Sequence, residues 1–341
     1  MMHRFYRIFL CTLAMAVAGC AKVDVSPDAK GDGWEHDIHL PVPVEFALGY
    51  PEAKSIISDE DDLVGKPFGV FALNADPSVA MDERMYMDNV PATCAKPDQA
   101  VLFNLGKTYY YPLDATDWYG FYCYHPYAHD GRAFRTPDGM LAVAVPLGGT
   151  DDILYAKAET GTDADGNVTP GFNAEYLRNG GAIPSFSFSH PASGLSFRIR
   201  NDAASMAGRK VDYLRFDEFT MEALLCLEDA DPSSGNEGQL LSENSAVAIS
   251  YYLGDTDALD VAIPQKGSAA YLYETIFAMP QMYFECTLSV DGSEYGFILH
   301  PGDLQEGLNG HMPGHVYRYL FVIEDAGGRI RIRLEKDVMN N

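Results

Sequence analysis

Basic residues, closely spaced cysteines and long hydrophobic runs are scarce in this 341-residue chain. Lysine and arginine together number 24 against 49 acidic residues, and the formal net charge is −25. Such a negative field repels nucleic acid, so we exclude nucleic-acid binding. No two cysteines have the C-x-x-C spacing, which argues against a zinc site built on close thiolate pairs.

Motifs of catalysis are also missing, since the chain has neither a G-x-S-x-G nucleophile turn nor a P-loop. The densest group of reactive side chains is "CYHPYAHD", which runs from Cys123 to Asp130. Cys123 and His125 share one face of a predicted strand, but His129 follows a proline and Asp130 begins a turn signal. A third ligand is therefore not assured, and we expect a strand that runs into a loop.

An acidic loop, "DADGN" at Asp163–Asn167, resembles half of a calcium-binding loop. Its glycine comes too early, and no glutamate stands at the twelfth position, where an EF-hand has its bidentate ligand. We expect no metal site and no cofactor, and we predict that the protein is not an enzyme.

The N-terminus has the features of an export signal. Arg4 and Arg7 precede an apolar run from Ile8 to Ala18, which is shorter than the roughly 20 residues of a membrane-spanning helix. Small residues then lead directly into Cys20, an arrangement that resembles the bacterial lipoprotein processing box. We expect residues 1–19 to be a lipoprotein signal peptide and Cys20 to be lipidated; secretory cleavage beside an incidental cysteine is the alternative.

The cysteines that remain after processing are Cys94, Cys123, Cys226 and Cys286. Export permits disulfides, and the sequence does not select among the three pairings that four cysteines allow. Cys123 and Cys286 lie in apolar strands, where a lone cysteine is typically a small buried hydrophobe.

Short segments rich in valine, isoleucine, phenylalanine and tyrosine recur between turn-forming clusters, and this pattern predicts an all-β fold. Only 219–227 has a helical pattern. Predicted strands are 40–48, 68–73, 107–112, 119–124, 140–145, 153–156, 185–189, 195–201, 211–216, 246–253, 259–263, 282–290, 296–300, 316–324 and 329–334.

The length suggests two domains at about 100 to 200 residues each. Glycine, aspartate, asparagine and threonine cluster between Thr160 and Gly181, and we place the boundary near the end of that stretch. An N-terminal β-domain would cover 20–182 and a C-terminal β-domain 183–341.

Several segments resemble, in the right order, the fimbrillin family of Bacteroidota, which comprises subunits and associated tip or anchor proteins of type V pili. Each segment alone is weakly specific, but their order makes the resemblance fairly specific. Together they span most of residues 40–334. Besides the box ending at Cys20, they are "PVEFALGYPEAKS" (43–55), "FGVFALN" (68–74), "TYYYPLDATDWYGFYCYHPY" (108–127), "DILYAKA" (152–158), "PSFSFSHPASGLSFRIRND" (184–202), "FAMPQMYFECTLSVDGSEYGFIL" (277–299) and "GHVYRYLFVIEDAGGRIRI" (314–332).

The resemblance implies two transthyretin-like β-sandwich domains in tandem and a structural or adhesive subunit of a cell-surface fimbria. In such proteins a protease cleaves after a basic residue in the loop that follows the first strand, that strand leaves, and a strand of a neighbouring subunit fills the groove. The implied partners are other fimbrillin subunits, a processing protease, the outer membrane through lipid on Cys20, and a ligand on a host or bacterial surface. The role as stalk, tip or anchor stays open.

Carried onto this chain, the removable strand is Leu40–Leu48, and Val42, Val44, Phe46 and Leu48 form its apolar face. Lys54 stands where the family is cut, although many members have arginine there. Lys66 is the fallback, and a subunit that is never processed, as an anchor would be, is the rival.

The last hairpin supplies a candidate donor strand with Ile330, Ile332 and Leu334 on one face. An ordinary edge hairpin whose arginines discourage aggregation is an equal alternative. At the level of the whole protein, the runner-up is a non-polymerising outer-membrane lipoprotein that binds carbohydrate or protein.

Overall fold

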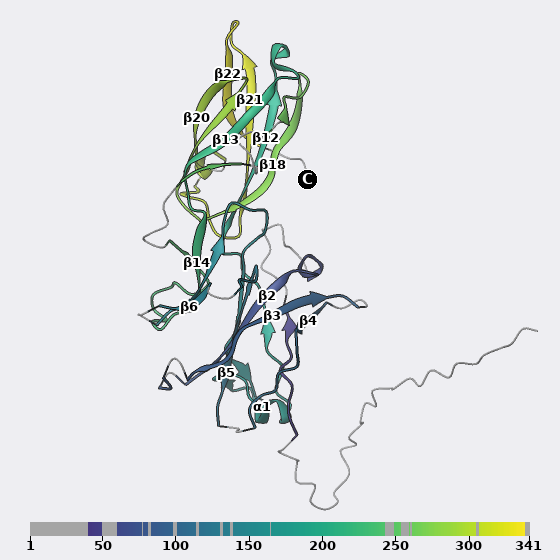
Figure 1. The fold of residues 1–341 in the computed structure, drawn as a ribbon, viewed down its shortest axis with the longest axis vertical. Helices are drawn as coiled ribbons and strands as arrows, with labels where there is room; N and C mark the ends of the chain where they lie inside the picture. The colour runs from purple at the N-terminus through teal and green to yellow at the C-terminus, as the bar shows by residue number, and fades with distance from the viewer. Residues whose placement is uncertain are drawn as a thin grey trace, which may run out of the picture. The chain divides into compact units, whose positions relative to one another are not determined.

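The structure is a computed structural model of the 341-residue chain. It describes residues 40–49, 60–76, 78–80, 83–97, 101–113, 116–129, 132–136, 139–163, 165–242, 249–253, 259, 261–304 and 307–337. Strands dominate these residues (Figure 1). The helical elements that they contain are α1 (Ala174–Arg178), α2 (Pro301–Leu304) and the 3-10 turns η1 (Glu60–Leu63) and η2 (Ala204–Met206). The all-β prediction is therefore confirmed.

A five-stranded antiparallel sheet has the strand order β4 (Leu102–Leu105), β3 (Met85–Ala95), β2 (Pro67–Asn74), β5 (Tyr119–His125) and β8 (Leu154–Ala158). Every residue of β5 is buried, so the sheet is covered on both faces. Phe121 and Cys123 join one hydrophobic cluster, whereas Tyr122 and Tyr124 join another. The predicted alternation of this aromatic strand is thus confirmed.

A four-stranded sheet has the order β15 (Leu240–Leu241), β14 (Glu222–Glu228), β7 (Leu141–Pro146) and β6 (Ala133–Arg135). The predicted helix at 219–227 is wrong, because most of this stretch is strand β14, antiparallel to β7. Leu225 packs in the cluster that contains Tyr122, and Cys226 packs in a small cluster on the opposite face. Because both faces of β14 are buried, its sequence lacks the polar alternation that marks a half-exposed strand.

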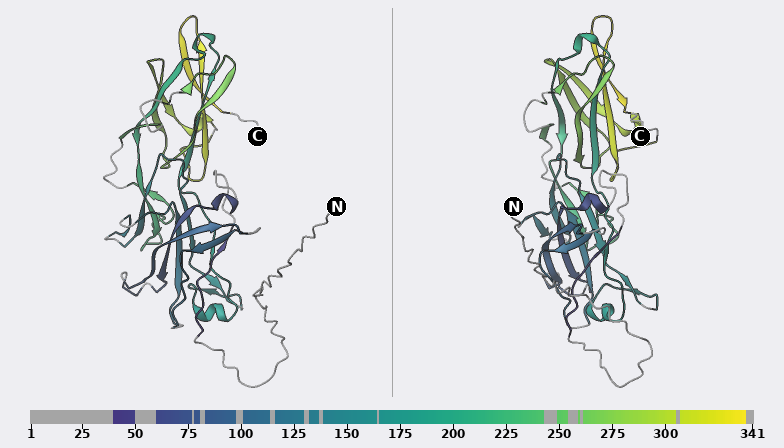
Figure 2. Two further views of the ribbon diagram at one scale, coloured as in Figure 1. Left: turned by 45° about the vertical axis from the view of Figure 1, so that its right-hand side comes forward. Right: turned by 90° about the vertical axis from the view of Figure 1, so that its right-hand side faces the viewer.

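The remaining large sheets face each other as a β-sandwich. One has the order β16 (Ile249–Tyr252), β13 (Lys210–Phe219), β19 (Phe284–Val290) and β20 (Ser293–Leu299), and β17 (Val261–Ala262) also pairs with β13. The other has the order β18 (Ser268–Ala278), β12 (Ser193–Asn201), β21 (Val316–Asp325) and β22 (Ile330–Lys336). Both layers are visible in teal, green and yellow in Figure 2.

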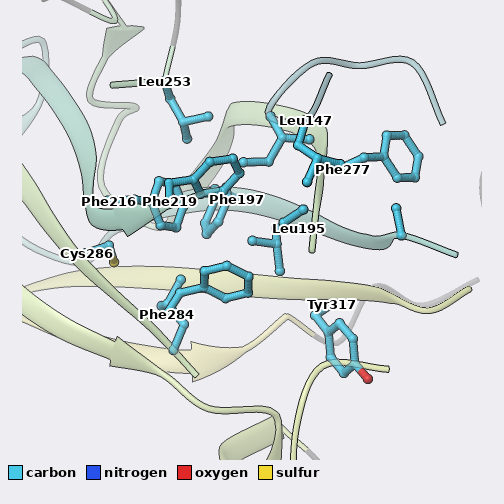
Figure 3. Close-up of a cluster of buried hydrophobic side chains, with 14 of the residues drawn as sticks. Leu147, Leu195, Phe197, Phe216, Phe219, Leu253, Phe277, Phe284, Cys286 and Tyr317 are labelled. Carbon is cyan, nitrogen blue, oxygen red and sulfur yellow. The ribbon is translucent and has the colours of Figure 1, made fainter. Parts of the chain in front are cut away.

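Aromatic rings fill the space between these two sheets. Phe197 from β12 lies 5.8 Å from Phe216 of β13 and 6.3 Å from Phe321 of β21, measured between ring centroids. Figure 3 shows Phe197 and Phe216 with Phe219, Phe284 and Cys286 in the same cluster. Each such side chain contributes on the order of 2 kcal/mol by burial, so this core is a major source of stability.

Two short sheets complete the described fold: β1 (Ala47–Leu48) runs parallel to β11 (Ser185–Phe186), and β9 (Gly161–Thr162) forms a hairpin with β10 (Val168–Thr169). The predicted strand 107–112 is wrong as a strand, since its only ladder contact with other described residues is an isolated bridge between Tyr110 and Pro43. The predicted strand 40–48 is reduced to β1, and the rest of it is extended chain with that one bridge.

Candidate functional site

The described members of the group "CYHPYAHD" lie in different surroundings. The Cys123 thiol is fully buried, and burial raises its pKa well above the ordinary value. His125 is buried too, with Nδ1 2.7 Å from the carbonyl oxygen of Pro67, and burial lowers its pKa. His129 is exposed, and Asp130 lies outside the described residues. In the described part of the chain no three His, Cys, Asp or Glu side chains are grouped so as to hold a metal ion.

The cysteines in the described part of the chain are core residues. Cys94, Cys123, Cys226 and Cys286 are each at most 2% exposed. Cys123 and Cys286 are free thiols, and burial raises the pKa of Cys286 as well, so neither thiol is set up as a nucleophile.

The segment Val42–Leu48, which we name the N-terminal segment, supplies apolar side chains to a core far along the sequence. Val44 is 6% exposed and Phe46 is 8% exposed, while Val42 and Leu48 are half-buried and pack against the same cluster. The predicted apolar face is therefore turned toward the core. Whether the segment can be removed stays a prediction.

The N-terminal segment changes its pairing partner halfway along its length. The amide of Val44 donates to the carbonyl of Tyr109 at 2.9 Å, and the amide of Tyr111 donates to the carbonyl of Val42 at 2.9 Å. Three residues later, the amides of Ala47 and Gly49 donate to the carbonyls of Pro184 and Phe186 at 2.8 and 2.7 Å. Each pairing is short, so the segment is held more by side-chain burial than by a continuous ladder.

Phe46 is the main anchor of this segment. Its ring stacks on Phe186 with centroids 4.6 Å apart, and it meets Phe121 at 5.1 Å and Phe103 at 5.7 Å in edge-on contacts. Aromatic pairs in such geometries stabilise beyond their buried area. Removal of the segment would therefore uncover an apolar floor made of at least three phenylalanine rings.

A surface groove of about 410 Å³ runs between the N-terminal segment and β4. Its walls include Leu102, Phe103 and Leu105 from β4 and Ile183 from the chain before β11. Leu102 and Ile183 are exposed, and β4 is an edge strand. An added strand can form hydrogen bonds with the backbone of an edge strand and bury apolar side chains in a groove beside it.

The structure also describes two basic residues of this region. Arg178 at the end of α1 donates from Nη2 to the carbonyl of Leu40 at 2.6 Å and so holds the chain just before the N-terminal segment. Lys66 is half-buried just before β2. Cys20 and Lys54 lie outside the described residues, so lipidation and cleavage stay predictions.

The C-terminal hairpin consists of β21 and β22, paired from Tyr319↔Lys336 to Asp325↔Ile330. Ile332 is 7% exposed, and Ile330 and Leu334 are partly buried against the sandwich core. Arg331 and Arg333 form ion pairs with Glu324 on β21. The predicted donor face is thus occupied within its own sandwich in this structure, and β22 is an edge strand.

The acidic loop is organised by its own backbone. Asp163 Oδ1 accepts from the amides of Asp165 and Asn167 at 3.0 and 2.8 Å, and its Oδ2 accepts from Asn167 Nδ2 at 3.1 Å. These hydrogen bonds lower the pKa of Asp163. The arrangement closes the turn between β9 and β10.

The sequence did not point to a buried ion-pair triad. Glu228 at the end of β14 lies 2.6 Å from Arg84 and 3.1 Å from Arg135, measured between carboxylate oxygens and guanidinium nitrogens. The partners are separated by 144 and 93 residues, which no local pattern reveals. The triad joins β14 to β6 and to the start of β3.

A buried histidine was also missed. His311 is 3% exposed, with Nε2 2.8 Å from the hydroxyl of Tyr319 and Nδ1 3.1 Å from the carbonyl of Gln281. Burial lowers its pKa to about 4. The folded protein therefore keeps this imidazole neutral at pH values where the unfolded chain charges it.

We expect this histidine to make stability pH-dependent. An unfolded imidazole takes up its proton near pH 6.5, whereas folded His311 does so near pH 4. Its contribution to stability is complete above the unfolded pKa and is lost as pH falls toward 4, with a total change on the order of 3 kcal/mol. Urea denaturation of the wild type and of His311→Gln at pH 7 and 4.5 measures this effect. Between these two pH values, the free energy of unfolding should fall by about 2 kcal/mol less in the glutamine variant than in the wild type. Equal losses in both proteins would rule out His311 as the source.

No helix among the described residues is long and apolar enough to cross a membrane.

Comparison with known proteins finds similarity in solved structures. No protein-family model matches the sequence, and no curated protein sequence matches it. A fimbrial protein from Bacteroides vulgatus is 13% identical with a TM-score of 0.49, over 86% of this chain and 99% of that one. A proposed cell adhesion protein from Bacteroides uniformis is 15% identical with a TM-score of 0.48, over 87% and 97%. The fimbrial anchor protein Mfa2 from Porphyromonas gingivalis is 11% identical with a TM-score of 0.40, over 87% and 98%. These are likenesses of fold.

Proposed function

We propose that this chain is a structural or adhesive subunit of a cell-surface fimbria, exported as a lipoprotein anchored through Cys20 and assembled by protease-triggered strand exchange. The observation that carries the proposal is the N-terminal segment, which buries Val44 and Phe46 in a core to which it is joined by two short backbone pairings. The resemblance of the sequence to fimbrillins supports the same assignment.

The physical sequence of events follows from the geometry of the segment. A cut after Lys54 would leave residues before it attached only by non-covalent contacts. Departure of the segment would expose the rings of Phe103, Phe121 and Phe186 together with the carbonyls of Tyr109 and Pro184. A strand from a second subunit would regain both burial and hydrogen bonds there, so exchange is favourable once the original segment has gone.

The donor in this proposal is the C-terminal hairpin. Strand β22 must leave its pairing with β21 to donate, because Ile332 is already buried against its own core. The ion pairs of Arg331 and Arg333 with Glu324 are at the surface and oppose this release only weakly.

Limited proteolysis tests the proposal. We expect a lysine-specific protease to cut the soluble chain (residues 21–341) first after Lys54, and we expect loss of the N-terminal fragment to be followed by filaments. Mass spectrometry identifies the cut, and electron microscopy detects the filaments. Lys54→Gln should prevent both, whereas Lys66→Gln should behave as the wild type.

A peptide competitor gives a sharper control. An excess of a peptide with the sequence of residues 40–49 should refill the groove and stop filament growth, and the same peptide with Phe46→Ala should not. A chain that resists the protease and stays monomeric would contradict strand exchange and favour an unprocessed anchor.

A further inference from the structure

A second cavity, of about 450 Å³, opens beside helix α1 and the β9–β10 hairpin. Its lining includes the rings of Trp118 and Tyr176, the carboxylates of Asp163, Asp165 and Glu175, and the amide of Asn179. The volume is within the range of about 300 to 1,000 Å³ that is usual for small-ligand sites. We propose that this pocket binds an uncharged saccharide.

Tyr176, on the aromatic wall of the pocket, is held by hydrogen bonds. The hydroxyl of Tyr176 donates to the carbonyl of Thr162 at 3.0 Å and accepts from the amides of Thr162 and Ala182 at 3.2 and 3.1 Å. Trp118 is half-buried, and its ring lies 6.1 Å from that of Tyr176 at an angle of 59°. The negative face of an indole ring attracts the polarised C–H bonds on the apolar face of a pyranose.

The polar wall is rich in hydrogen-bond acceptors, which suit a ligand that carries hydroxyl groups. Asp163 is fixed by the amides of Asp165 and Asn167, while Asp165 and Glu175 are exposed at the pocket. An ionised carboxylate only accepts hydrogen bonds, and its two oxygens can serve neighbouring hydroxyls of one sugar. Asn179 adds an amide that both donates and accepts.

Charge decides the class of saccharide. The described residues that line the cavity include three carboxylates and no lysine, arginine or histidine. Sialic acids, uronic acids and sulfated sugars would place a further negative charge beside these three carboxylates, which is unfavourable. Among the described residues these carboxylates are not grouped closely enough to hold a metal ion, so a neutral sugar is the occupant we propose.

The pocket goes beyond the proposed assembly and does not depend on it. Its residues come from the chain before β5, the β9–β10 hairpin and α1, and it shares no lining residue with the groove beside β4. A soluble monomer can therefore bind the sugar even if the chain never polymerises.

Tryptophan fluorescence tests the proposal directly. The chain has two tryptophans, so Trp34→Phe leaves Trp118 as the single reporter. The probes are the methyl glycosides of glucose, galactose, mannose and N-acetylglucosamine, with glucuronic acid, N-acetylneuraminic acid and a tri-lysine peptide for comparison. We expect at least one neutral glycoside to change the emission saturably and the two acids to leave it unchanged.

Two double variants, each of which removes two negative charges, distinguish the effect of the pocket carboxylates from that of the protein's overall negative charge. Asp165→Asn with Glu175→Gln should raise the Kd of the neutral glycoside at least tenfold, whereas Glu218→Gln with Glu285→Gln, also exposed, should not change it. The proposal is overturned if no neutral glycoside binds, if the acids or the peptide bind better, or if both double variants behave alike.

Discussion

Replacing Phe46 by alanine is expected to free the N-terminal segment while the C-terminal sandwich stays folded. The substitution removes the contacts of this ring with Phe103, Phe121 and Phe186. A buried phenylalanine-to-alanine change costs about 3 to 5 kcal/mol. Because the segment has only short backbone pairings on either side of this residue, the loss should appear first as local opening.

Hydrogen exchange followed by mass spectrometry measures this effect. The amides of Val44 and Gly49 should exchange roughly 100-fold faster or more in Phe46→Ala, while those of β13 and β19 keep their protection. Glu45→Ala, an exposed change in the same segment, should have no effect. Phe284→Ala, an equal truncation in the C-terminal sandwich, should lower global stability without selective opening of the segment. Unchanged exchange at Val44 in Phe46→Ala would disprove the role of this ring as the anchor.

Strand alternation made part of the fold predictable from sequence. In β5 the side chains divide between two cores as the two-residue period requires, with Phe121 and Cys123 on one face and Tyr122 and Tyr124 on the other. For this reason the first part of the most reactive-looking stretch, Cys123 to His125, was correctly predicted to lie in a strand.

Tertiary burial accounts for the misassigned strand β14, and a bulge accounts for the missed strand β3. β14 is rich in helix-forming glutamate, alanine and leucine, but packing on both faces overrides that propensity. β3 was missed because Asp88, Asn89 and Pro91 interrupt it with a turn-like composition. Asn89 has a positive φ of 44°, and the register of β2 against β3 shifts beside it. The turn-like residues therefore form a bulge within a continuous strand.

The candidate site was predictable in part. The apolar face of the N-terminal segment was visible as alternation of Val42, Val44 and Phe46, but its partners were not. Phe186 lies 140 positions beyond Phe46 in the chain, and the change of pairing from Tyr109 to Pro184 follows from how distant strands meet. The proposed saccharide pocket likewise brings Trp118 together with residues between Asp163 and Gly181.

Glutamine in place of Glu228 is expected to destabilise the protein strongly. The carboxylate is nearly buried, with a side-chain exposure of 9%, and it is the shared partner of Arg84 and Arg135. A neutral amide of the same shape leaves two half-buried guanidinium groups without a counter-charge. Breaking a buried ion pair in this way costs about 3 to 5 kcal/mol, which urea denaturation at pH 7 would measure.

A triple replacement distinguishes the cost of unpaired charge from the loss of attraction. Arg84→Met, Glu228→Leu and Arg135→Met together remove all three charges and keep the volume, so stability should return to within about 1 kcal/mol of the wild type or exceed it. If the triple variant is as unstable as Glu228→Gln, packing or hydrogen bonding by these side chains matters more than their charge.

The triad ties β14, which follows residue 182, to β6, which precedes it. Glu228→Gln should therefore also speed amide exchange in β14 and β7. This would show that the two halves of the sequence are joined energetically through that sheet.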